Sequence, residues 1–306
     1  MVLEAERFEE SMRHGGVRLR FVRWGSGPGA RGLSTDGCGE PGAWKRQPPL
    51  VLLHGFAQSA ETWAQAASSL ARFRAVYALD LVGHGESDRP AQPSAYSLDA
   101  QAEALLAFMG ELAGEAAKPI VAGYSMGGRV ALAAALRDPS RFGALALESA
   151  GLGPRSHAER EASFAADAER ARRLRAHGVR PFMDDWARLP LFETQARLPE
   201  AVRDRLRAGR LANDPEALAR TFEGAGQHAM PDRARVLEAL PRFPFRVLYL
   251  CGGLDAKYRA VGEELARLEG ASNIAVETVA EAGHNVHVEQ PDRFARLLEA
   301  FLASLA

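Results

Sequence analysis

Short apolar runs alternate with amphipathic segments along most of this chain. Three to six consecutive hydrophobic residues are typical of strands that a parallel sheet buries on both faces. Such runs occupy residues 50–53, 75–79, 120–122, 144–147, 245–250 and 274–279. Helical spacing predicts helices around residues 62–70, 96–114 and 292–305, and an alanine-rich segment after Gly128 predicts another. The alternation predicts an α/β fold with a doubly wound, mostly parallel sheet.

Two segments near the N-terminus depart from this alternation. Residues 16–24 alternate Val17, Leu19 and Phe21 with arginines, which is the period of a half-exposed strand at a sheet edge. Residues 25–49 are rich in glycine, proline and serine and show no hydrophobic period. They are predicted to form a long loop.

The alternation also stops between residues 152 and 240. This segment is strongly charged, and its apolar residues recur at helical spacing. We expect an all-helical cap that packs over the sheet. The predicted organisation is a first part of the core at residues 1–151, the cap at residues 152–240 and a second part of the core at residues 241–306.

The composition of the chain limits the classes of binding partner and the cellular compartment that we expect. A formal net charge of −1 over 306 residues argues against a surface for nucleic acid. Two cysteines, Cys38 and Cys251, are too few for a disulfide framework, and no apolar run reaches the roughly 18 residues of a membrane span. The acidic N-terminal segment does not have the pattern of a signal peptide. We expect a soluble, cytoplasmic protein, and nothing in the sequence indicates its oligomeric state.

The segment around Ser125 carries the strongest chemical signal. The apolar run at residues 120–122 leads into Gly123-Tyr124-Ser125-Met126-Gly127 and then into the alanine-rich helix, which is a G-x-S-x-G motif in strand, turn and helix context. Such a turn is so tight that its flanking residues must lack side chains, and it lifts the serine hydroxyl clear of the sheet. Ser125 is the candidate nucleophile. The alternative is a glycine-rich turn with an incidental serine.

Two more polar residues follow predicted strands. Asp255 comes after the strand at residues 245–250, and His284 after the strand at residues 274–279. The chain order Ser, Asp, His is that of an α/β hydrolase, in which parallel strands bring three loop tips together. A serine hydroxyl needs an imidazole as base, and the imidazole needs a carboxylate to fix its tautomer. The sequence therefore predicts a triad of Ser125, His284 and Asp255.

Each partner of the predicted triad has a competitor. Glu148 also follows a strand, and His287 lies three residues after His284. The H-x-x-H spacing is a weak signal for a metal, because no third ligand lies at a recognisable spacing, and we expect no metal. Asp80 and His84 follow another strand, and we expect them to hold their loop in place by hydrogen bonds.

Backbone groups complete the predicted site. The oxyanion hole of this fold pairs the N–H of the residue after the nucleophile with an N–H from an early strand-to-helix loop. These positions correspond to Met126 and, in the His54-Gly55-Phe56 loop, to Phe56. Because side-chain identity hardly constrains a backbone donor, Phe56 is predicted from its position alone.

Several segments resemble one family in particular. The similarity lies in GYSMGGRVALA, LESA, FMDDWARLPLF, RLANDPEALA, CGGLDAKY and AGHNVHVEQPDRF, and it extends from residue 50 to the C-terminus, cap included. These segments are similar to 2-succinyl-6-hydroxy-2,4-cyclohexadiene-1-carboxylate synthase of menaquinone biosynthesis. The resemblance implies a lyase that eliminates pyruvate from 2-succinyl-5-enolpyruvyl-6-hydroxy-3-cyclohexene-1-carboxylate. In that reaction Ser125 would remove a proton from the substrate, without a metal or an organic cofactor.

The resemblance also implies a pocket for a small polycarboxylate. Arg129, one helical turn after Ser125, and Arg210 in the cap match positions that bind substrate in the family, and Tyr124 and Trp186 match pocket-lining positions. A guanidinium suits carboxylates because it donates two parallel hydrogen bonds. Without the resemblance, Arg210 could equally be a solvated helix charge.

The sequence departs from the family pattern at two places. Gly151-Leu152-Gly153 stands where the family commonly has Ser-Pro-Gly. Ser163 falls where the family has an arginine, although Arg155 and Arg160 are near it in sequence. These departures keep one alternative open, a serine carboxylester or C–C bond hydrolase on the same triad. A noncatalytic ligand-binding relative that keeps the fold is a further alternative, which the intact triad disfavours.

Overall fold

The computed structural model describes residues 5–25, 47–72, 74–112 and 118–305. Most of the loop predicted at residues 25–49 lies outside these residues. The chain folds into an eight-stranded sheet in the order β1-β2-β4-β3-β5-β6-β7-β8. Strand β2 runs antiparallel to both of its neighbours, β1 and β4, and all other neighbouring pairs run parallel. The strands are β1 Arg7–His14, β2 Val17–Trp24, β3 Leu50–Leu53, β4 Val76–Leu79, β5 Ile120–Tyr124, β6 Ala144–Glu148, β7 Arg246–Gly252 and β8 Ile274–Val279.

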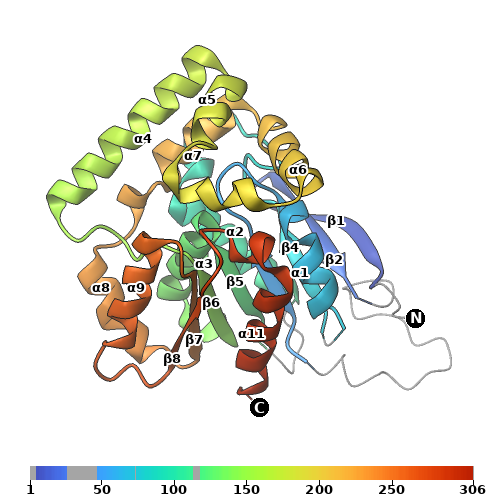
Figure 1. Ribbon diagram of the computed structural model, residues 1–306, viewed down its shortest axis with the longest axis vertical. Helices are drawn as coiled ribbons and strands as arrows, with labels where there is room; N and C mark the ends of the chain where they lie inside the picture. The colour runs from blue at the N-terminus through green and yellow to red at the C-terminus, as the bar shows by residue number, and fades with distance from the viewer. Residues whose placement is uncertain (1–4, 26–46, 73, 113–117, 306) are drawn as a thin grey trace.

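Helices cover both faces of this sheet (Figure 1). Alternate side chains of β3 show why: Val51 and Leu53 join the core cluster that contains α2, α3 and α9, whereas Leu50 and Leu52 join the cluster that contains α1 and α11. Each strand is apolar on both sides because each side meets a helix layer. The core helices are α1 Ala64–Leu70, α2 Leu98–Leu112, α3 Met126–Arg137, α9 Ala256–Ala266, α10 Val286–Glu289 and α11 Pro291–Ala303.

Residues 157–239 form helices joined by short loops, and most of these helices lie above one end of the strands of the sheet (Figure 1). Their own apolar cluster includes Leu174, Phe182, Leu218 and Phe222 and packs against Phe56 of the core. Helix α8 instead lies beside α9, at the side of the core. These helices are α4 His157–His177, α5 Val179–Trp186, α6 Glu200–Leu211, α7 Pro215–Ala225 and α8 Arg233–Ala239, with a 3₁₀ segment at Pro190–Arg197. The division of the chain at residues 152 and 240 stays a prediction.

Strand β1 is the strand that the hydrophobic pattern missed. Its sequence, RFEESMRH, alternates exposed with partly buried positions, and only Met12 is fully buried. An edge strand that pairs on one side needs few apolar residues, so its pattern resembles that of a polar loop. The predicted buried strands all form, with boundaries that differ by at most two residues.

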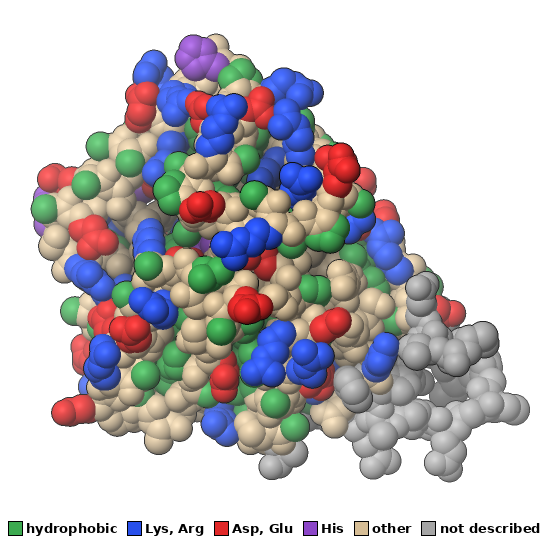
Figure 2. All heavy atoms as spheres, viewed as in Figure 1, with side chains coloured by type: hydrophobic (Ala, Val, Ile, Leu, Met, Phe, Trp, Pro, Cys, Tyr) green, Lys and Arg blue, Asp and Glu red, His purple; other side chains and the backbone are tan. Residues whose placement is uncertain are grey.

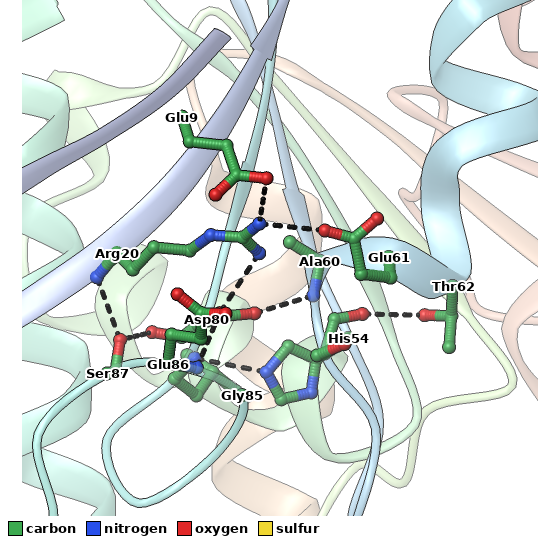
Figure 3. A network of polar contacts seen from close by, with 12 residues as sticks. Glu9, Arg20, His54, Ala60, Glu61, Thr62, Asp80, Gly85, Glu86 and Ser87 are labelled. Atoms are coloured by element: carbon green, nitrogen blue, oxygen red, sulfur yellow. Dashed lines mark hydrogen bonds and ion pairs between the residues drawn. The ribbon is translucent and has the colours of Figure 1, made fainter. Parts of the chain in front are cut away.

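A buried ionic network joins the antiparallel edge of the sheet to two loops of the core (Figure 3). Arg20 on β2 contacts Asp80 at 3.2 Å and Glu61 at 2.7 Å. Asp80 in turn accepts a hydrogen bond from the Ala60 N–H at 2.7 Å, and its carbonyl accepts one from the Ser87 hydroxyl at 2.6 Å. As predicted, Asp80 holds the loop that follows β4 in place, and it also contacts the segment after β3 through Ala60.

On the face shown in Figure 2, basic and acidic side chains are interspersed over the cap and the core. Many cap arginines form ion pairs with neighbouring acids, for example Arg172 with Glu169 and Arg175 with Glu216. Within the described part of the chain, no helix combines the length and the apolar character needed to cross a membrane.

Candidate active site

Ser125 lies at the apex of a strained turn between β5 and α3. Its backbone φ is 51° and ψ is −106°, a conformation that a residue with a side chain seldom adopts. A Cβ at Gly123 would lie 2.5 Å from the carbonyl oxygen of Gly127, and a Cβ at Gly127 would clash with the carbonyl oxygens of Leu53 and His54. The glycines are therefore required by the close approach of backbone on either side of the serine.

The structure brings the three predicted triad residues together. His284 Nε2 lies 3.1 Å from Ser125 Oγ, and His284 Nδ1 lies 2.7 Å from Asp255 Oδ2. Because Nδ1 faces a carboxylate, it carries the proton, which leaves Nε2 free to accept the serine proton. The other oxygen of Asp255 accepts the Tyr258 N–H at 3.2 Å at the start of α9, so the carboxylate is held from both sides. This geometry suits base activation of a serine hydroxyl.

The competing residues Glu148 and His287 form a second pair beside the first. Glu148 Oε2 lies 2.8 Å from His287 Nδ1, and its Oε1 accepts the His287 backbone N–H at 3.0 Å. The His287 ring stacks on Trp63 at 3.6 Å between centroids. Both residues of this pair are buried, and neither lines the cavity next to Ser125. The two histidines of the H-x-x-H motif thus contact different carboxylates.

The candidate oxyanion donors flank the serine. Met126 is the first residue of α3, where the N–H groups of a helix have no acceptor within the helix. Phe56 follows β3, and both residues line the cavity that contains Ser125. Their role in binding an oxyanion stays a prediction.

His54 and His84 support the loop that carries Phe56. The Leu81 N–H donates to His54 Nε2 at 3.0 Å, so the ring proton is on Nδ1, which donates to the Gly55 carbonyl at 2.8 Å. His84 Nδ1 lies 3.1 Å from the Val82 carbonyl, in agreement with its predicted loop role. Burial lowers the pKa of His54 from 6.5 to about 4 and the pKa of His84 from 6.5 to about 3. Both rings are therefore neutral at physiological pH.

We expect these neutral histidines to make folding stability fall in mild acid. Between pH 6.5 and pH 4 the unfolded chain binds a proton at His54 that the folded chain does not, so stability is full above this window and is lost as the pH falls. Each such histidine contributes a slope of roughly 1 kcal/mol per pH unit. Urea unfolding of the wild type and of His54→Gln across this range should show a shallower slope for the variant. An equal slope would contradict a neutral His54.

Ser125 opens onto a cavity of about 690 Å³ between the sheet edge and the cap. Its lining has an excess of positive charge, because six basic residues face only Glu159 and Asp167. The basic residues are Arg129, Arg155, Arg170, Arg210, Arg233 and Lys257. On the face shown in Figure 2 basic and acidic groups are mixed, so this excess in the cavity marks a site for an anion.

Two of these arginines, the buried Arg210 and the partly buried Arg129, have no carboxylate partner among the described residues. Arg129 donates from Nη2 to the Ala225 carbonyl at 3.0 Å, and its buried Nε has no acceptor within the described chain. Arg210 donates to the Gln195 side-chain oxygen at 2.8 Å and lies over the Phe192 ring. Burial lowers the pKa of both guanidiniums. A buried cation of this kind is stabilised by an anionic ligand.

Tyr124 and Trp186 also line the cavity. The Tyr124 ring contacts His284 at 5.1 Å between centroids, and burial, together with Glu148, raises its pKa well above the usual value. Tyr124 is therefore a neutral phenol, and its hydroxyl group can donate a hydrogen bond to a ligand. Trp186 packs against Phe56 and Phe222, which forms an aromatic wall from the cap to the loop after β3.

The departures at residues 151–153 and 163 both face the cavity. A Cβ at Gly151 would clash with the side-chain amide of Gln227, which lines the cavity there. Arg160 does not line it, because its guanidinium binds the carbonyl groups of His228 and Met230 and the Asp232 carboxylate.

Arg170, Gln227 and Lys257 are among the polar cavity residues that sequence reasoning did not single out. Arg170 lies seven residues after Ser163 on α4, so helical spacing from a cavity-facing position could have found it. Gln227 follows the cap helices in a short 3₁₀ segment, and no periodic signal marks it. Lys257 follows the triad acid by two residues, which places it in the first turn of α9.

The comparisons with known proteins agree on one family. Residues 50–297 match the family model described as the alpha/beta hydrolase family. A 2-succinyl-6-hydroxy-2,4-cyclohexadiene-1-carboxylate synthase of Citrobacter koseri is 34% identical over 254 residues, which are 83% of this chain and 91% of the relative. A Bacillus subtilis protein assigned to the same synthase is 36% identical over 256 residues, which are 84% of this chain and 90% of the relative.

Solved structures give the same result for the fold. MenH from S. aureus matches with a TM-score of 0.78 and 29% identity, covering 84% of this chain and 94% of that chain. A thermophilic esterase from Thermogutta terrifontis matches with a TM-score of 0.75 and 24% identity, covering 98% and 99% of the two chains. The second likeness shows the fold alone.

Proposed function

The chain belongs to the family of 2-succinyl-6-hydroxy-2,4-cyclohexadiene-1-carboxylate synthases within the alpha/beta hydrolases, and from this premise we infer that it is a lyase of menaquinone biosynthesis. It eliminates pyruvate from 2-succinyl-5-enolpyruvyl-6-hydroxy-3-cyclohexene-1-carboxylate, the precursor. The observation that carries this function is the pairing of an intact serine, histidine and aspartate array with a cavity rich in arginine. An ester hydrolase needs the first feature but not the second.

The reaction can be followed from the difference between precursor and product. The product has ring double bonds at carbons 2 and 4, whereas the precursor has one at carbon 3. Carbon 2 must therefore lose a proton, the ring double bond must shift, and the bond between carbon 5 and the enolpyruvyl oxygen must break. The released enolpyruvate takes up a proton and becomes pyruvate. The proton at carbon 2 is acidified by the neighbouring succinyl ketone.

The triad can supply the base for this step. His284 Nε2 accepts the proton of Ser125, and the serine oxygen removes the proton from carbon 2. Asp255 stabilises the imidazolium that forms. Negative charge then develops on the ketone oxygen, where the N–H groups of Phe56 and Met126 and the phenol of Tyr124 are the candidate donors. Arg129 and Arg210 are the candidate partners for substrate carboxylates.

The test is an assay of the purified protein on two substrates. Pyruvate released from the precursor is followed by coupling to lactate dehydrogenase and NADH, and a short-chain nitrophenyl ester is assayed in parallel. Pyruvate release at a rate far above the ester rate supports the lyase. Ester cleavage without pyruvate would identify a serine hydrolase, and the absence of both activities would leave a ligand-binding protein.

Arg129→Ala should discriminate between the charged and the neutral substrate. We expect kcat/KM for the precursor to fall about a hundredfold, because the variant leaves a carboxylate without its charged partner. The nitrophenyl ester carries no carboxylate, so its hydrolysis should change less than about threefold. Thermal melting of both proteins checks the fold. Equal losses on the two substrates would show that Arg129 supports the structure through the Ala225 carbonyl and does not bind the substrate.

A further inference from the structure

The precursor carries three carboxylates, one each on the ring, the succinyl chain and the enolpyruvyl group. Arg210, which is buried, and Arg129, which is partly buried, are the cavity arginines that form no ion pair with any acid in the described part of the chain. They can serve two of the three carboxylates. A third desolvated carboxylate requires another cation, since burial of an unpaired charge is costly. The remaining cations of the cavity lining are Arg155, Arg170, Arg233 and Lys257.

Three of these four are less suited to bind a carboxylate inside the cavity. Arg233 donates to Glu264 from both Nε, at 3.0 Å, and Nη2. Arg155 reaches the same carboxylate at 3.4 Å, and its side chain is 63% exposed. Lys257 is exposed on α9, with its ammonium 5.1 Å from the ring centroid of Tyr258. An ammonium on a flexible stem gives no two-point recognition of a carboxylate.

Arg170 has a different environment, because its side chain, although 41% exposed, lies against aromatic rings. It extends from α4, on the face where Ser163, Ala166 and Asp167 also line the cavity. Its guanidinium lies over Trp186 and Phe222, at 5.9 and 5.7 Å from the ring centroids. Stacking on aromatic faces leaves the edge of a guanidinium, which carries the N–H groups, available for a ligand. Both rings contact Phe56 of the loop after β3, so Arg170 belongs to the wall that faces Ser125.

The only hydrogen bond of the Arg170 side chain to the described chain leaves most of its donors unused. Nη1 donates to Asp167 Oδ1 at 2.6 Å, which occupies one of five N–H groups. Asp167 also contacts His228 Nδ1 at 3.1 Å through its other oxygen. A substrate carboxylate at Arg170 would therefore not leave Asp167 without a partner. Asp167 fixes the guanidinium in place, while the remaining N–H groups stay available.

We propose that Arg170 binds the third carboxylate of the substrate, stacked on Trp186 and Phe222 and oriented by Asp167, and that it selects for the tricarboxylate. This assignment rests on the proposed function. It gives the cavity one arginine for each carboxylate, with Arg129 from the core and Arg170 and Arg210 from the cap. Arg170 thereby supplies on α4 the positive charge that the family has at the position of Ser163.

Calorimetry of the precursor on a Ser125→Ala parent tests this assignment, because the parent binds without turnover. Adding Arg170→Gln should weaken binding about 10- to 100-fold, the usual range for a lost charged hydrogen bond. Arg172→Gln is the matched control, since Arg172 lies on the same helix, is paired with Glu169 and does not line the cavity. Arg170→Lys should recover part of the affinity. In the otherwise wild-type enzyme, Arg170→Gln should raise KM with kcat changed less than about threefold.

Two results would overturn the assignment. Equal affinity in the Arg170→Gln and Arg172→Gln proteins would show that Arg170 makes no contact with the substrate. A loss of affinity on Lys257→Met but not on Arg170→Gln would move the third carboxylate to α9. In both cases pyruvate release by the wild type would leave the proposed function intact. If the wild type released no pyruvate and the parent bound no precursor, the proposed function would fail, and the assignment of Arg170 with it.

Discussion

Ser125→Ala should lower the rate of pyruvate release about a thousandfold and leave precursor affinity unchanged within about threefold. The magnitude is that of a positioned general base, which contributes roughly 10²- to 10⁴-fold. The hydroxyl is the only group of Ser125 that the variant removes, and alanine is no more strained than serine at a φ of 51°. Affinity is retained because the arginines of the cavity are untouched. Pyruvate release and calorimetry measure the two quantities on the same preparation.

Ser149→Ala is the matched control for this variant. Ser149 also follows a strand, has a positive φ of 47° and is fully buried, but it does not line the cavity. Its hydroxyl has no hydrogen-bond partner among the described residues, so its removal should leave the rate within about threefold. If Ser125→Ala kept most of the wild-type rate, His284 itself would have to remove the substrate proton. The serine would then serve only to position the ring.

The proximity of the three proposed triad residues could be predicted because parallel strands end at the same edge of a sheet. Ser125, Asp255 and His284 are far apart in sequence, but each follows a buried strand, and the apolar runs that mark such strands are the clearest pattern in this chain. Glu148 satisfied the same criterion. Only the structure shows that its carboxylate faces His287 and not His284. The position of a residue after a strand identifies it as a candidate for the site. Which acid contacts which histidine depends on the directions of the side chains, and these come only from the structure.

The cap was less predictable at the level of single residues. Helical spacing identified the segment, but its arginines look alike in sequence, and most have an acid three or four residues away. The structure separates them by burial: Arg210 is 7% exposed and faces the cavity, whereas Arg160 binds backbone carbonyl groups of the cap. The resemblance to the family pointed to Arg210 and Trp186. Gln227 became visible only once the helices were placed over the sheet, whereas Arg170 could have been found from its helical spacing to Ser163.

Asp255→Asn should lower the rate of pyruvate release about a thousandfold or more, and Glu148→Gln should lower it less than about tenfold. The asparagine oxygen can still accept the Tyr258 N–H, so its amide group would face His284 Nδ1. Nδ1 would then have to be the acceptor and Nε2 would carry the proton. A ring in that tautomer cannot take the proton of Ser125.

Glu148→Gln makes the same change, carboxylate to amide, in the pair of Glu148 and His287. Because the chemical change is the same, a difference between the two variants reflects the location of the carboxylate. Glu148→Gln disturbs the hydrogen bonds to the backbone N–H and the ring of His287, which should cost about 1–3 kcal/mol of folding free energy. His287 stacks on Trp63 and does not line the cavity, so a change of its tautomer leaves the proton path between Ser125 and His284 in place. Rates and urea unfolding of both variants therefore separate catalysis from stability. A larger rate loss in Glu148→Gln than in Asp255→Asn would assign the catalytic carboxylate to Glu148 and break the proposed triad.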